Sequence, residues 1–130
     1  PSMNFLEGRL SAAGAELYIE GNGFRLRVPP EKAARLRTSG SSEVVLGVRP
    51  GDILDRTSVP DANPEECLTV GVEAVEPMGN DMLVYLMLGE RRLLAQMGPG
   101  SSVRAGHKLE VVISMARMHA FDRATEQALT

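Results

Sequence analysis

The stretch Glu43-Val44-Val45-Leu46-Gly47-Val48-Arg49-Pro50-Gly51-Asp52-Ile53 decides the fold, because it holds a buried strand and the corner that ends it. A run of branched apolar residues is typical of a strand buried on both faces. Pro50 fixes φ and has no backbone N–H, so a regular strand stops there. We expect a strand at residues 43–49. We also expect Arg49 to brace the corner through carbonyl or carboxylate oxygens, and Asp52 to close the turn on nearby backbone amides.

Alternating residues before this stretch predict a β-hairpin. Residues 15–19 and 24–28 each place apolar side chains on one face, and Gly21-Asn22-Gly23 between them tolerates positive φ. Residues 29–37 predict the one helix, since their leading prolines, early acid and late arginine suit a helix N-terminus and dipole. The first third of the chain therefore reads as hairpin, short helix and strand.

Four more strands are expected after the corner, at residues 68–75, 82–88, 91–97 and 109–115. Residues 57–64 contain turn formers without periodicity and predict an exposed loop. Many short strands with frequent turns are typical of a small barrel or sandwich. The predicted fold class is mainly β: a small barrel of the oligonucleotide/oligosaccharide-binding (OB) type with one short helix, as one domain over residues 1–130.

Composition argues against several classes of protein. The net charge is −3 and aromatic residues make up 4% of the chain, whereas nucleic-acid binding needs a basic groove with aromatic platforms. The single cysteine fits a reducing compartment, and no apolar stretch reaches the roughly 20 residues of a membrane-spanning helix. A start at Pro1 without a signal peptide suggests a piece of a longer cytoplasmic protein.

Residues with catalytic or metal-binding chemistry lack the required spacing. No phosphate-binding loop with Gly-Lys-Ser/Thr is present, and His107, His119 and Cys67 do not have zinc-ligand spacing. The acidic pairs at residues 52 and 55 and at residues 65 and 66 read as turn residues rather than acid–base pairs. The seven methionines read as core filler in a chain without tryptophan. We therefore predict no catalytic, cofactor-binding or metal-ligating residue.

Four separated motifs carry a family resemblance: Met3-Asn4-Phe5-Leu6-Glu7-Gly8, Leu46-Gly47-Val48-Arg49-Pro50, Val72-Glu73-Ala74-Val75-Glu76-Pro77-Met78-Gly79 and His119-Ala120-Phe121-Asp122-Arg123-Ala124-Thr125. Together they resemble the C-terminal transport-associated OB (TOBE) domain of ATP-binding subunits in maltose-type ABC importers. Gly51, Ala120 and Glu126 depart from the usual Glu, Leu and Gly of that family. The motif residues that the resemblance singles out as structural are Asn4, Phe5, Gly47, Arg49, Pro50, Gly79, His119, Phe121 and Asp122.

The resemblance implies a regulatory and dimerising domain without activity of its own. Its parent would be a transport ATPase that couples ATP hydrolysis to uptake of a carbohydrate-type solute. ATP and Mg²⁺ would belong to the missing nucleotide-binding domain. The implied partners are a second copy, the membrane permease subunits and a cytoplasmic regulator, with the complex peripheral to the inner membrane.

Two alternatives stay open. Related barrels in molybdate-transport ATPases hold oxyanions through backbone amides and small polar side chains. The loops at Gly79-Asn80, residues 98–102 and residues 39–42 offer such groups here. His119 reads either as an imidazole that anchors the C-terminal tail or as a pH-sensitive contact.

Overall fold

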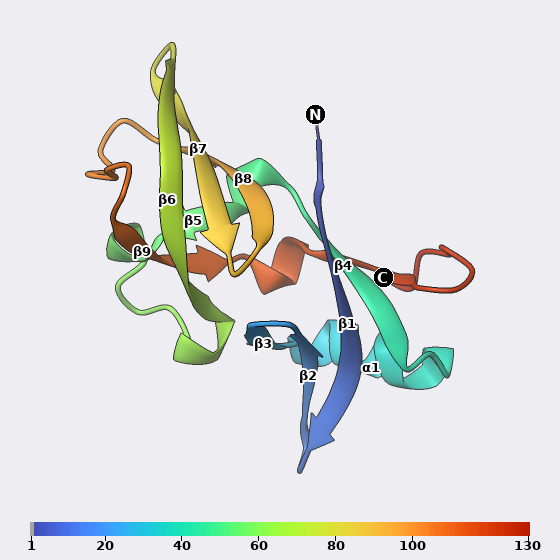
Figure 1. The fold of residues 1–130 in the computed structure, drawn as a ribbon. Coiled ribbons are helices and arrows are strands. Elements are labelled where there is room, and N and C mark those ends of the chain that lie inside the picture. The colour runs from blue at the N-terminus through green and yellow to red at the C-terminus, as the bar shows by residue number, and fades with distance from the viewer. Residues whose placement is uncertain (1) are drawn as a thin grey trace.

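Two five-stranded antiparallel sheets make up the protein (Figure 1). The structure is a computed structural model that describes residues 2–130. Sheet A has the order β10-β4-β1-β2-β3, and sheet B has the order β5-β9-β6-β7-β8. The strands of sheet A are β1 (Asn4–Ala13), β2 (Glu16–Gly21), β3 (Phe24–Arg27), β4 (Glu43–Val48) and β10 (His119–Asp122). The strands of sheet B are β5 (Ile53–Asp55), β6 (Cys67–Met78), β7 (Asp81–Leu88), β8 (Arg91–Met97) and β9 (Lys108–Ile113).

The predicted fold class is confirmed: the chain is mainly β and OB-like, with α1 (Pro30–Ser39) as the one α-helix of residues 2–130. The predicted hairpin is β2 paired with β3. The helix follows it and ends at Gly40, whose φ of 75° is a left-handed cap that favours glycine. Helix α1 buries Ala33 and Leu36, which anchor it to the core.

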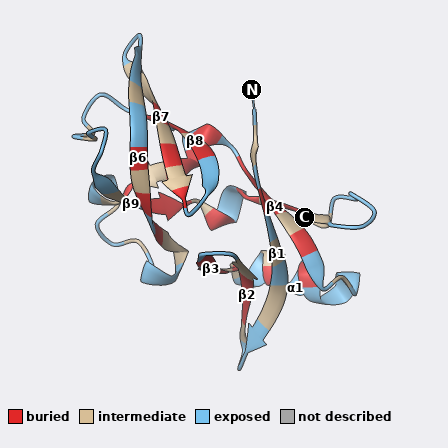
Figure 2. Ribbon diagram, viewed as in Figure 1, coloured by how far each residue is buried: buried red, intermediate tan, exposed pale blue. Residues whose placement is uncertain are grey.

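One hydrophobic core runs through both sheets. Buried residues alternate with half-buried or exposed ones along β7 and β8, as expected for strands with one covered face. Figure 2 shows buried segments where the sheets meet and exposed residues at the far end of the β6–β7 hairpin. Met97, Met115 and Met118 lie in the core as predicted, whereas Met78 is 56% exposed near that hairpin end.

The sequence patterns did not predict three strands that are short or irregular: β1, β5 and β10. Strand β1 pairs with β2 on one side and β4 on the other, so it is central to sheet A although Gly8 interrupts its apolar pattern. Strand β5 has three residues and β10 has four, which is too short for periodicity to be recognised. Their partners are distant in sequence, and that pairing positions the candidate site.

The corner after β4 differs in detail from the prediction. The strand ends at Val48, and a 3₁₀ turn at Pro50–Asp52 leads into β5. Asp52 is buried, with 8% of the residue exposed, and its side chain accepts a hydrogen bond from Arg117 Nε at 2.9 Å, so the expected bonds to nearby backbone amides are wrong. Its backbone holds the turn instead: Asp52 N donates to Arg49 O, and Ser114 N donates to Asp52 O, both at 2.9 Å. The partner Arg117 lies 65 residues away, so no local pattern could indicate it.

The predicted loop at residues 57–64 is largely exposed and contains 3₁₀ turns at Arg56–Ser58 and Pro64–Glu66. Glu65 on the second turn accepts a hydrogen bond from Tyr18 Oη at 2.6 Å, which ties the turn to β2. No helix within residues 2–130 is long and apolar enough to cross a membrane.

Candidate functional site

Strand pairing brings three of the four motifs side by side on sheet A. Phe5 of β1 lies opposite Gly47 of β4, and Gly47 lies opposite His119 of β10. In the next row on the same face, Val45 of β4 lies opposite Phe121 of β10. Motifs separated by more than a hundred residues therefore converge on one outer face.

Gly47 makes room for the side chains that cover this face. A Cβ atom on Gly47 would lie 2.5 Å from Met3 Sδ and 3.2 Å from Phe121 Cε2, both closer than comfortable contact. Met3 and Phe121 therefore fill the space above the glycine. The role of Gly47 here is to let neighbouring residues lie close to the sheet.

An aromatic pair with a cavity beside it stands on this face. Phe5 is 52% exposed, and its ring meets the Phe121 ring edge-on with centroids 6.2 Å apart. Phe5, Val45, Phe121, Asp122 and Glu126 line a cavity of about 380 Å³. We call these five residues the Phe5 surface. A large exposed aromatic beside an apolar hollow is typical of an interaction surface.

The loop after β10 closes one side of the cavity, and Asp122 holds it. Asp122 Oδ2 accepts from Ser41 Oγ at 2.5 Å, and Oδ1 accepts from the backbone N–H groups of Ala124 and Thr125 at 2.9 Å. The hydrogen bond from Ser41, with those from the backbone amides, lowers the pKa of the Asp122 carboxyl below its ordinary value. Arg123 in the same loop lies 3.3 Å from Glu7 and 3.4 Å from Glu43.

Asn4 joins the site to sheet B. Its amide Nδ2 donates to Val48 O at 3.1 Å and to Leu94 O at 2.9 Å, while its Oδ1 accepts from Leu94 N at 2.8 Å. The side chain thus uses both backbone groups of Leu94 on β8, as a neighbouring strand would. Beside it, Arg91 Nη1 donates to Phe5 O at 3.0 Å.

Arg49 and His119 meet at the other end of the row. Arg49 Nη1 lies 3.0 Å from His119 Nε2, so its partner within residues 2–130 is an imidazole rather than the expected carbonyl or carboxylate. Arginine is always a donor, so Nε2 of the imidazole is the acceptor in this contact. This contact ties β10 to the end of β4, next to the buried Pro50.

One motif residue lies apart from the others, and two lining residues were not predicted. Gly79 occupies the β6–β7 turn with φ 65°, and it supports that turn rather than the Phe5 surface. Val45 and Glu126 line the cavity but were not predicted as site residues. Val45 reads as part of a buried strand in the sequence, and Glu126 is notable there only as a departure from the family's usual glycine. The outward direction of Val45 follows from its spacing of two from Gly47, once Phe5 and His119 are known to flank that glycine.

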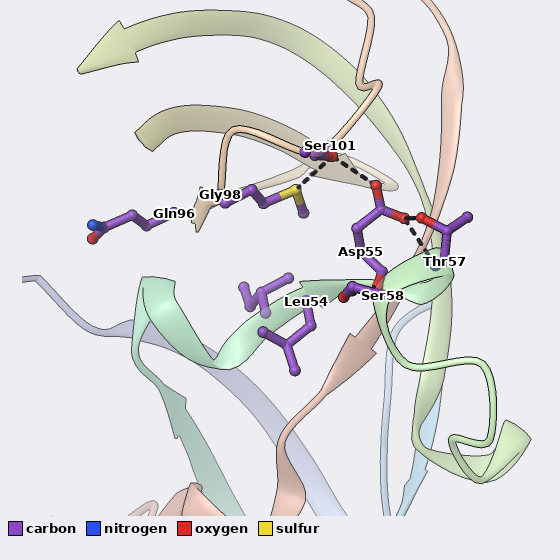
Figure 3. Close-up of a pocket in the computed structure, with 10 residues that line it drawn as sticks. Leu54, Asp55, Thr57, Ser58, Gln96, Gly98 and Ser101 are labelled. Carbon is purple, nitrogen blue, oxygen red and sulfur yellow. Dashed lines mark hydrogen bonds between the residues drawn. The ribbon is translucent and has the colours of Figure 1, made fainter. Parts of the chain in front are cut away.

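A second cavity tests the idea of an oxyanion site. It measures about 290 Å³ and is lined partly by the predicted loop, through Gly98, Gly100 and Ser101. Figure 3 shows that Ser101 and Thr57 turn their hydroxyls toward Asp55. Ser101 Oγ donates to Asp55 Oδ2 at 2.6 Å, and Thr57 donates to Oδ1 through Oγ1 at 2.8 Å and N at 3.0 Å. The Asp55 carboxylate therefore already accepts the hydrogen bonds that Ser101 and Thr57 would have to donate to an oxyanion.

Asp55 is ionised in this setting. Burial, with 6% of the residue exposed, by itself raises the pKa of the carboxyl, but the hydrogen bonds from Ser101 and Thr57 outweigh it and lower the pKa below its ordinary value. The negative charge then repels anions from the cavity. The loop at residues 98–102 thus fastens to β5 rather than offering an anion site.

Comparison with known proteins identifies the family. The model of the MalK OB fold domain matches residues 1–53. The trehalose/maltose import ATP-binding protein MalK of Thermococcus litoralis is 32% identical over 99% of this chain and 35% of its own length. The uncharacterised ABC transporter ATP-binding protein YurJ of Bacillus subtilis is 31% identical, with the same coverage of both chains. Residues 1–53 belong to the MalK OB fold domain family, and the chain as a whole is similar to ATP-binding proteins of sugar importers.

A further relative and a solved structure are also similar to this chain. The oligosaccharides import ATP-binding protein MsmX of Bacillus subtilis is 28% identical over 97% of this chain and 34% of its own length. The chain thus spans about a third of the length of these curated relatives. A solved structure of the cytoplasmic molybdate-binding protein ModG superposes with a TM-score of 0.68 at 22% identity, and the match covers 90% of this chain and 94% of that one. This likeness extends the fold assignment beyond residue 53, to both sheets.

Proposed function

We propose that this MalK-type OB domain is the regulatory and dimerising part of the ATP-binding subunit of an ABC importer for carbohydrate-type solutes. The observation that carries the proposal is that relatives named as sugar and oligosaccharide import ATP-binding proteins match along 97–99% of the chain. The domain itself performs no hydrolysis. ATP and Mg²⁺ are bound elsewhere in the whole subunit, which associates with membrane permease subunits at the cytoplasmic side of the membrane.

The structure offers what such a domain needs. A single core joins both sheets, and Asn4 links them at one edge, so the domain moves as one body. The Phe5 surface leaves an aromatic residue in contact with water, which favours association with another protein. Association through a rigid body is therefore the role that we assign to the domain.

Two measurements on the 130-residue chain test the proposal. Light scattering after size-exclusion chromatography is expected to show a mass that rises from monomer to dimer with concentration. Calorimetric titration with MgATP is expected to show no binding. A strict monomer at the highest attainable concentration contradicts the dimerising role, and tight MgATP binding contradicts the assignment of nucleotide binding to another part of the subunit.

A further inference from the structure

We propose that the cavity beside Asp55 binds a small organic ammonium compound, that is, a primary amine in its protonated form. The cavity lies between β5 and residues 98–101, which follow β8, and we call it the Asp55 cavity. This inference goes beyond the proposed function, which gives the domain no ligand of low molecular mass. Three features of the cavity support it: a buried charge, a wall of hydrogen-bond acceptors and a volume that suits a short aliphatic chain.

Asp55 carries a buried negative charge that no cation within residues 2–130 neutralises. Only 6% of the residue is exposed, and its carboxylate takes part in none of the ion pairs of the described residues. The groups that donate to this carboxylate, Ser101 Oγ, Thr57 Oγ1 and Thr57 N, are all neutral. A buried carboxylate is usually paired with a cation, because burial without a counter-charge costs free energy. An ammonium group in the cavity supplies the missing charge.

The hydroxyl groups around the carboxylate are left as acceptors. A hydroxyl has one proton to donate and lone pairs that accept. Ser101 and Thr57 donate their protons to the Asp55 carboxylate, and Ser58 Oγ donates to Asp55 O at 2.7 Å (Figure 3). The three hydroxyl oxygens therefore serve a ligand only by accepting. An ammonium group, which has N–H donors and no acceptor, matches such a wall.

The size and charge of the Asp55 cavity fit an organic cation better than a metal ion. Its volume is about 290 Å³, whereas one water molecule takes roughly 30 Å³ in the liquid. Asp55 is the one charged residue among the 10 that line the cavity, and a divalent ion prefers several carboxylate or carbonyl ligands. Ile53, Leu54 and Met97 add apolar side chains to the lining. A single positive charge on a short aliphatic chain uses both the polar and the apolar part of the wall.

The first test compares ligands of similar shape on the wild-type chain. Nitrogen–proton correlation NMR spectra are recorded during titration with butylammonium chloride, n-butanol, sodium butyrate or potassium chloride. We expect butylammonium to shift the amide signals of Gly98, Gly100 and Ser101 with a millimolar dissociation constant, which a ligand of about five non-hydrogen atoms can reach. The signals of Gly14 and Gly23, which lie in exposed turns outside the cavity, should not move.

The other three compounds are the controls for this titration. n-Butanol has the aliphatic chain without the charge, butyrate carries the opposite charge, and potassium has the charge without the chain. Equal shifts with n-butanol or butyrate overturn the role of the positive charge, and equal shifts with potassium chloride overturn the organic ligand. Butylammonium that leaves the three cavity amides unshifted overturns the site altogether.

The second test removes the charge of the cavity. Asp55→Asn keeps the shape of the side chain, and Asp61→Asn removes the same charge from the exposed loop as the matched control. We expect Asp55→Asn to weaken butylammonium binding by about tenfold or more, because hydrogen bonds to an ionised acceptor are the stronger ones, and Asp61→Asn to leave it unchanged. Circular dichroism checks that each variant is folded, and the wild-type titration decides if Asp55→Asn is not. A folded Asp55→Asn chain that binds butylammonium like the wild type overturns the proposal.

Discussion

At the scale of single residues, Glu126 adopts a backbone conformation that L-amino acids rarely take. Its φ is 64°, and within residues 2–130 it is the one non-glycine residue with positive φ. The left-handed region brings Cβ close to the following carbonyl oxygen, which glycine avoids. The resemblance gives glycine as the common residue at this position, and the structure supplies the physical reason.

Replacing Glu126 by glycine should therefore stabilise the protein. Relief of the left-handed conformation outweighs the added freedom of the unfolded chain, and we expect a gain of about 1 kcal/mol in the free energy of unfolding. Urea unfolding at low protein concentration measures it without a contribution from association. Glu126→Ala serves as the control, because it removes the same side chain but keeps the Cβ atom. An equal gain in both variants shows that the charge, not the backbone, is responsible.

Gly8 and Gly47 should respond differently to a methyl group. A Cβ on Gly8 would lie 2.7 Å from the backbone oxygen of Glu20, which the sheet holds in place. A Cβ on Gly47 would lie 2.5 Å from Met3 Sδ, near the end of a flexible side chain. We expect Gly8→Ala to lower the free energy of unfolding by about 1–3 kcal/mol and Gly47→Ala by less. Chemical denaturation checks this order, and the reverse order would show that the Met3 and Phe121 side chains cannot adjust.

At the scale of elements, the Asn4 side chain joins the two sheets through hydrogen bonds to backbone groups, as a neighbouring strand would. Asn4 bonds to both backbone groups of Leu94 on β8 and also to Val48 O on β4. Tyr18 on β2 makes a similar tie to the 3₁₀ turn at Pro64–Glu66 through Glu65. The hydrogen bond raises the pKa of the Tyr18 hydroxyl above its ordinary value.

Truncating Asn4 should destabilise the junction between the sheets. Asn4→Ala removes three hydrogen bonds and leaves two carbonyl groups and one N–H to find other partners, so we expect a loss of about 2–3 kcal/mol in the free energy of unfolding. Asn80→Ala, at the exposed β6–β7 turn, is the matched control and should stay within about 0.5 kcal/mol of the wild type. Similar values for the two variants would mean that water replaces the Asn4 bonds at little cost.

Elements with a clear hydrophobic periodicity could be predicted from the sequence. Strands that depend on pairing with a strand far away in the chain could not. The hairpin of β2 and β3, helix α1 and the long strands β7 and β8 follow from patterns within a few residues. Strands β1 and β10 gain their definition from pairing with β4, which lies 30 or more residues away in the chain. The same limit applies to the site. The motifs named Phe5, Gly47 and Phe121, but only the sheet register brings them together and adds Val45 and Glu126.

At the scale of the whole molecule, Asp55 makes stability depend on pH. Its folded-state pKa is lowered, so its ionised form stabilises the fold above the pKa of the unfolded chain. The stabilisation is lost as the pH falls from about 4, the ordinary aspartate value, through the lower folded value. At neutral pH this contribution is fully present.

A difference measurement isolates this contribution from other carboxyls, such as Asp122. Urea midpoints of the wild type and Asp55→Asn are compared from about pH 7 down to about pH 2, a range that spans ordinary carboxyl pKa values. The wild type should be the more stable at neutral pH, and its advantage should shrink as the solution becomes more acidic. Parallel curves across the whole range would show that the Asp55 carboxyl titrates alike in both states.

The position of β10 has a consequence for how the protein is made. Strand β4 pairs with β1 on one side and receives β10 on the other, and Met118 and Ala120 are fully buried. A nascent chain therefore carries an unpaired edge of β4 until the ribosome has released residues 118–122. Such an edge is a template for pairing with other chains. Sheet A therefore closes only after residues 118–122 have left the ribosomal tunnel.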